Sequence, residues 1–140
     1  MTTIAASLKH QSMSADSRMI YDDTTYSISK IKRLADGSLL GFSGSMALCM
    51  KMIAYIEGEA PEPEVGGEHE FDIVILRKDK IELYPNQLKP VDLQDLFCGI
   101  GTGGKVALAA MRAGKTPKQA VELALTVDSN SYGPVHTERL

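Results

Sequence analysis

The chain has 140 residues and a formal net charge of −3, with 44% hydrophobic and 24% charged residues, which is typical of one soluble globular domain spanning residues 1–140. The slightly acidic balance argues against a nucleic-acid partner, which needs a basic surface, and no apolar run approaches the roughly 20 residues that cross a membrane. The first residues are too polar for a secretion signal and the two cysteines lack paired spacing, so we expect a cytoplasmic protein without disulfides.

The first third of the chain has the character of strands. Residues rich in Thr, Ile, Ala and aromatic side chains predict antiparallel strands over 2–8, 13–20, 26–34 and 38–43. Polar residues 21–25 and the Ala35-Asp36-Gly37 sequence provide turns between them. We therefore expect a meander of strands with short links.

The middle of the chain combines a helix, a loop and a hairpin. Apolar residues recur at helical spacing from Met46, and Gly58 ends this segment. Residues 59–70 follow, with two prolines, two glycines and five glutamates, and such a stretch predicts a surface loop. Strands over 71–76 and 80–84 then form a hairpin, and a further short strand is expected at 96–100.

The last third is helical. An Ala-rich helix is predicted over 103–113, and Gly114 ends it. Thr116-Pro117-Lys118-Gln119 has the pattern of a capping box with proline at the first helical position, and the helix that it begins ends between Asp128 and Gly133. Because helices and strands do not alternate, antiparallel sheets covered by helices fit this order better than a doubly wound sheet.

The segment Gly99–Lys105 matches a dinucleotide fingerprint and nearly matches a phosphate-binding loop. The phosphate-loop interpretation fails at Val106, where Ser or Thr should hold magnesium, and the dinucleotide interpretation fails because a helix, not a strand, follows the first helix. The small residues more simply let a helix start approach the sheet closely. The three histidines lack ligand spacing, so no cofactor and no metal are expected.

Thr2 has a special chemistry if Met1 is removed. A terminal threonine carries a hydroxyl nucleophile and a free α-amine, whose pKa of about 8 lets it accept the hydroxyl proton at neutral pH. Taken alone, a threonine behind an initiator methionine is more often an ordinary residue.

Five motifs in order along the chain resemble the proteasome β-subunit family, and most closely its bacterial HslV-type peptidases, whose mature chain also begins Thr-Thr-Ile. They are Ala15-Asp16-Ser17-Arg18, residues 28–34, Gly41-Phe42-Ser43-Gly44-Ser45, residues 99–104 and residues 120–124. The resemblance implies an α+β fold, the four-layer αββα sandwich of N-terminal nucleophile hydrolases. Residues 59–70 stand where the family has a second long helix, so a reduced outer helical layer is expected.

The resemblance also implies a catalytic site. Thr2 would be the nucleophile, and Lys30 an ammonium beside it that favours its deprotonation and lowers the α-amine's pKa. Asp16 would orient Lys30, and the backbone N–H of Gly44 would donate to the oxyanion. The remaining implied site residues support the amine and its surroundings: Thr102, Asp128 and Ser131.

Four apolar residues fall where the family builds its primary specificity pocket: Met19, Ile28, Met46 and Met50. They favour cleavage after hydrophobic residues. Methionines that merely fill gaps in the core would explain the same residues equally well.

The implied activity is that of a threonine-type endopeptidase acting on proteins or peptides inside a homo-oligomeric ring. The chain carries no ATPase motif, so an unfolding ATPase would be a separate partner. Two other interpretations remain open: a catalytically silent scaffold or interaction protein of the same fold that retains Met1, and an amidase of the same superfamily that acts on small molecules.

Overall fold

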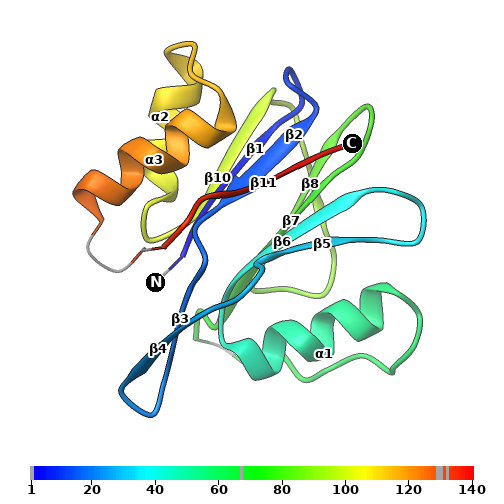
Figure 1. Ribbon diagram of the computed structural model, residues 1–140. Coiled ribbons are helices and arrows are strands. Elements are labelled where there is room, and N and C mark those ends of the chain that lie inside the picture. The colour runs from blue at the N-terminus through cyan, green and yellow to red at the C-terminus, as the bar shows by residue number, and fades with distance from the viewer. Residues whose placement is uncertain (1, 67, 129–130, 132) are drawn as a thin grey trace.

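The computed structural model describes residues 2–66, 68–128, 131 and 133–140 (Figure 1). Two antiparallel sheets face each other, and helices cover their outer sides. One sheet has the strand order β10-β1-β2-β11: Phe97–Gly101, Thr3–Ser7, Ser12–Ala15 and His136–Arg139. The other has the order β5-β6-β7-β8-β9: Ile31–Arg33, Leu39–Gly44, Phe71–Leu76, Ile81–Pro85 and Val91–Leu93.

Three helices complete the layers. α2 (Gly104–Arg112) and α3 (Pro117–Val127) pack on the four-stranded sheet, whereas α1 (Met46–Ile56) packs on the five-stranded sheet (Figure 1). A separate hairpin of β3 (Arg18–Tyr21) and β4 (Thr24–Ser27) extends from the sandwich. This αββα order confirms the predicted fold class, including the reduced outer layer, since the described part of residues 57–70 contains no second helix.

The alternation of strand side chains builds three cores. On β7, Val74 and Leu76 face the opposite sheet, whereas Ile73 and Ile75 pack against the α1 side. On β1 the small side chain of Ala5 faces α2 and α3, which can therefore approach closely. Helices therefore cover the outer sides of both sheets, and the side chains between the sheets form a separate inter-sheet core.

The predicted helices are confirmed, and both the first and the last of them have a side-chain N-cap. The Ser45 side chain accepts a hydrogen bond from the N–H of Leu48 at 3.3 Å, and this N-cap fixes the start of α1. Thr116 and Gln119 form the expected reciprocal capping box. None of the described helices is both long and apolar enough to cross a membrane.

The predicted meander is wrong in its connections. The segment 13–20 breaks at Asp16 and Ser17 into β2 and β3, and the segment 26–34 breaks before β5, so the first strands belong to three different sheets. Both breaks fall at the residues of one buried contact, in which Lys30 donates to Asp16 across fourteen residues of chain. Sequence reasoning also missed β9, which has only three residues and pairs with β8, and β11, which is polar and pairs with β2.

Both cysteines are free and buried. Burial raises the pKa of Cys49 and of Cys98 to about 12, so neither thiol forms a nucleophilic thiolate at neutral pH.

Candidate active site

Thr2 lies immediately before β1 at the open end between the two sheets, and only 7% of its surface is exposed. The Lys30 Nζ donates a hydrogen bond to the Thr2 Oγ1 at 3.1 Å. Lys30 immediately precedes β5, so the contact joins the first strand of one sheet to the edge strand of the other. A buried ammonium at this distance stabilises negative charge on the threonine oxygen.

Asp16 holds this ammonium in place. Both carboxylate oxygens of Asp16 accept from the Lys30 Nζ at 3.0 Å, and Oδ1 also accepts from the backbone N–H of Thr3 at 2.9 Å. Asp16 is fully buried and Lys30 is 3% exposed, so water screens this ion pair little. Burial lowers the pKa of Lys30 below its usual 10.5, and the charge of Asp16 opposes that shift.

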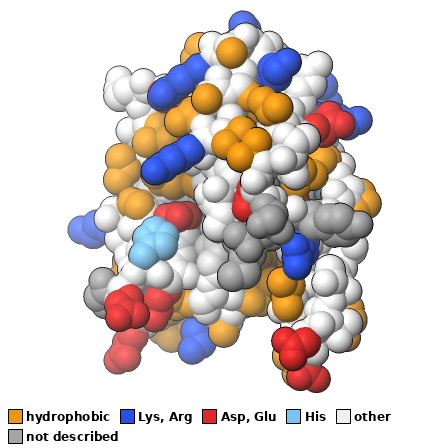
Figure 2. All heavy atoms as spheres, turned by 90° about the vertical axis from the view of Figure 1, so that its left-hand side faces the viewer, with side chains coloured by type: hydrophobic (Ala, Val, Ile, Leu, Met, Phe, Trp, Pro, Cys, Tyr) orange, Lys and Arg blue, Asp and Glu red, His pale blue; other side chains and the backbone are white. Residues whose placement is uncertain are grey.

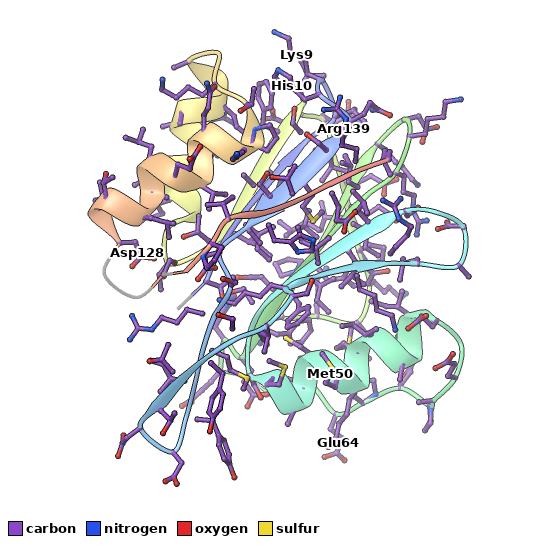
Figure 3. All side chains as sticks on the ribbon, viewed as in Figure 1. Lys9, His10, Met50, Glu64, Asp128 and Arg139 are labelled. Atoms are coloured by element: carbon purple, nitrogen blue, oxygen red, sulfur yellow. The ribbon has the colours of Figure 1, made fainter. Side chains whose placement is uncertain are left out.

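A chain of hydroxyl groups runs along the other side of the first residues. The hydroxyls of Thr102 and Ser131 donate to the same oxygen, Oδ2 of Asp128, at 2.5 and 2.6 Å. Ser131 donates its single hydroxyl hydrogen to Asp128. Thr3 Oγ1, which lies 2.7 Å from Ser131 Oγ, is therefore the donor in that pair. Asp128 lies at the end of α3, on the side of the molecule where the chain starts (Figures 1 and 3).

The glycine-rich segment from the end of β10 to the start of α2 fits against the start of the chain. A Cβ at Gly101 would lie 2.0 Å from the carbonyl oxygen of Thr2, and one at Gly103 would lie 2.0 Å from the Oγ1 of Thr3. A Cβ at Gly99 would meet the carbonyl of Gly104, the first residue of α2, at 2.1 Å. These contacts agree with the interpretation that the small residues permit close approach of the helix start.

Gly44 ends β6 beside Thr2 and has a positive φ of 111°. A Cβ there would lie 2.2 Å from the carbonyl oxygen of Glu70, which also accepts from the N–H of Ser45 at 2.8 Å. Only glycine fits this position, so the backbone can turn from the strand into the N-terminus of α1 next to the threonine.

A cavity of about 210 Å³ opens on one side of Thr2. Three of the four residues predicted for a specificity pocket line it: Met19, Ile28 and Met46. The fourth, Met50, lies one turn further along α1, is 45% exposed and is not among the lining residues (Figure 3). The structure therefore brings every predicted catalytic residue to the neighbourhood of Thr2, but does not bring Met50 to the cavity.

A second cavity, of about 400 Å³, opens on the other side, and sequence reasoning missed its charged residues: His69, Glu70 and Asp72. The one sequence feature that could have pointed to them is the single aspartate within the apolar strand Phe71–Leu76. Met1, whose removal the proposed chemistry needs, lies outside the described residues.

Comparison with solved structures shows the fold. Eukaryotic HslV from Trypanosoma brucei is similar with a TM-score of 0.77 at 21% identity, covering 97% of each chain. Thiobacillus denitrificans BPH is similar with a TM-score of 0.73 at 18% identity, covering 99% of this chain and 97% of that one. The same BPH in complex with Epoxomicin gives a TM-score of 0.74 at 17% identity, with the same coverage. No model of a protein family and no curated protein matches the chain in sequence.

Proposed function

We propose that this chain is a single-domain member of the HslV and proteasome β-subunit family and acts as a threonine-type endopeptidase, with Thr2 as nucleophile after removal of Met1. The observation that carries the proposal is the buried Lys30 ammonium 3.1 Å from the Thr2 hydroxyl, fixed by Asp16. The likeness of the whole chain to HslV and to a BPH that was solved with Epoxomicin supports the same activity.

The first step is acyl transfer. The Thr2 Oγ1 attacks the carbonyl carbon of the peptide bond while its proton passes to the free α-amine of the same residue. Lys30 stabilises the threonine oxygen as it loses its proton, and the N–H of Gly44 donates to the oxyanion, an interaction worth roughly 3 kcal/mol at comparable sites. The protonated α-amine then gives its proton to the departing amine, which leaves an ester between Thr2 and the acyl half of the substrate.

The second step releases the enzyme. Water replaces the departed peptide, the α-amine takes one of its protons, and the hydroxide equivalent attacks the ester carbonyl. The products are a carboxylic acid and a regenerated Thr2 hydroxyl. The hydroxyl chain from Thr102 and Ser131 through Asp128 holds the Thr3 side chain, next to the nucleophile, while these charges change.

The apolar cavity beside Thr2 supports cleavage after hydrophobic residues, since Met19, Ile28 and Met46 present apolar surface next to the nucleophile. The proposal includes a homo-oligomeric ring that encloses the sites and so keeps folded proteins away from them. Its substrates are peptides or unfolded proteins, which a separate ATPase would supply.

The test compares Thr2→Ala and Thr2→Ser with the parent protein. Intact mass spectrometry should show that the parent has lost one methionine residue, and hydrophobic fluorogenic peptides should be cleaved by the parent and, more slowly, by Thr2→Ser. Thr2→Ala should fold with an unchanged melting transition and cleave nothing.

A parent protein that retains Met1 and cleaves no peptide supports instead the catalytically silent scaffold. Equal hydrolysis by the parent and by Thr2→Ala would show that another residue is the nucleophile.

A further inference from the structure

The two cavities beside Thr2 are separated by a ridge that both share. Thr2, Ser43 and Gly44 line each of them, so the nucleophile stands between two distinct spaces. Successive side chains of an extended peptide point in opposite directions. A peptide that crosses this ridge can therefore place one side chain in each cavity.

The cavities differ sharply in charge. The first is lined by apolar residues together with Arg18 and Lys30. The second is lined by Asp72, Glu70 and His69, and among the described residues that line it there is neither lysine nor arginine. Figure 2 shows that a histidine lies close to several acidic side chains on the face where the chain begins.

Of these groups, Asp72 is the best placed to contact a substrate side chain in the second cavity. It lies opposite Ser43 in the pairing of β6 with β7. By strand alternation its side chain is on the same face as Val74, which belongs to the inter-sheet core. Packing alone would favour an apolar residue at such a position, yet a carboxylate stands there with 22% of its side chain exposed.

The position of Asp72 keeps it near the bond to be cleaved and partly out of water. Burial raises its pKa, and His69, whose Nε2 lies 2.9 Å from its Oδ2, opposes that shift. His69 is mostly exposed and sits on the loop between α1 and β7, so a substrate cation can displace it from Asp72. Reduced hydration makes the carboxylate a stronger partner for a cationic group than a surface carboxylate would be.

We propose that the second cavity receives the substrate side chain that follows the cleaved bond, and that Asp72 selects a lysine or arginine there. This inference rests on the proposed peptidase activity, because it assigns the apolar cavity to the residue before the bond. Glu70 forms part of the same wall through its backbone carbonyl and adds negative charge nearby. The preferred substrate is thus a peptide with a hydrophobic residue followed by a basic one.

The test uses three internally quenched peptides that differ only in the residue after a central leucine: Lys, Ala or Glu. With the mature full-length protein at low ionic strength, kcat/KM should be about tenfold higher for Leu-Lys than for Leu-Glu, and the ratio should shrink in high salt. Mass spectrometry of the products must show cleavage after leucine. Asp72→Asn should lower the ratio about fivefold by slowing the Lys peptide selectively.

Glu64→Gln is the matched control, because it removes one negative charge from an exposed residue of the same loop that does not line the cavity. It should leave the ratio unchanged.

Equal kcat/KM for the three peptides would overturn the assignment of Asp72 while leaving the peptidase proposal intact, and this result does not depend on any variant folding. A ratio that survives in Asp72→Asn, or that falls equally in Glu64→Gln, would also overturn it. If the parent protein cleaves none of the peptides, and Thr2→Ala behaves identically, both proposals fail.

Discussion

The two sheets of this protein differ in how they are covered and in what they contribute to the site. The four-stranded sheet carries two helices, and its polar groups near Thr2 are hydrogen-bonded to one another through Asp16 and Asp128. The five-stranded sheet carries α1 alone, and it contributes Gly44 and Asp72, which line open space. The comparison indicates that the well-covered half holds the reacting group in place, whereas the sparsely covered half determines what can approach it.

The largest expected effect comes from breaking the ion pair that joins the halves. Asp16→Asn keeps the shape of the side chain but leaves the Lys30 ammonium buried without its charged partner. We expect peptide hydrolysis to fall by at least about a hundredfold and the free energy of unfolding to fall by about 3 kcal/mol, with a cooperative transition. Loss of folding altogether would make the pair structural and not catalytic.

The stability of Asp16→Asn should also depend on pH in a defined direction. In the variant the pKa of Lys30 should fall further below 10.5, because burial lowers it and Asp16 no longer raises it. Between the lowered pKa of Lys30 in the folded variant and 10.5, the unfolded state binds more protons than the folded state, so the stability of the variant rises with pH in that range. Urea denaturation at pH 7 and pH 10 should show the gap from the parent protein narrowing at the higher pH.

The next effect should come from Gly44, on the open half. Gly44→Ala introduces a Cβ 2.2 Å from a backbone carbonyl at a φ of 111°, so we expect a loss of at least about 3 kcal/mol and of most activity. Gly37 is a matched control, since its φ is 90° but nothing lies within 4 Å of a Cβ there. Gly37→Ala should cost about 1 kcal/mol and leave peptide hydrolysis unchanged. Equal losses in the two variants would remove the steric argument at Gly44.

Sequence patterns were sufficient for most elements but not for the way the strands join. Residue periodicity, the Thr116 cap and the glycine stops identify the helices and the 71–84 hairpin. They could not show where 13–20 breaks, because the break depends on a contact between Asp16 and Lys30, fourteen residues apart. β11 has a polar sequence whose pairing comes only from its backbone, so hydrophobic pattern carries no sign of it.

The candidate site was accessible only through resemblance. No periodicity relates Thr2 to residues 16, 30, 102, 128 and 131, and yet the structure gathers them; their catalytic roles stay predictions until tested. Asp72 was missed because a single charge within an apolar strand looks like a solvent-facing residue. Its significance appears only when β7 is paired with β6 and faces Thr2.

The smallest expected effect concerns two methionines on one helix. Met46 and Met50 are four residues apart on α1, a spacing that places both on one face, and both were predicted to line the specificity pocket. Because α1 begins only at Met46, its first turn reaches the cavity beside Thr2 and the next turn does not. Met46→Ala should therefore lower kcat/KM for a leucine peptide by about fivefold through lost apolar contact, whereas Met50→Ala, at a residue that does not line the cavity, should change it less than twofold. Kinetics of both variants with leucine and alanine peptides check this. Equal effects of the two substitutions would mean that the specificity pocket extends along α1 beyond the cavity. The five-stranded half would then determine selectivity over a wider surface than the ridge at Thr2.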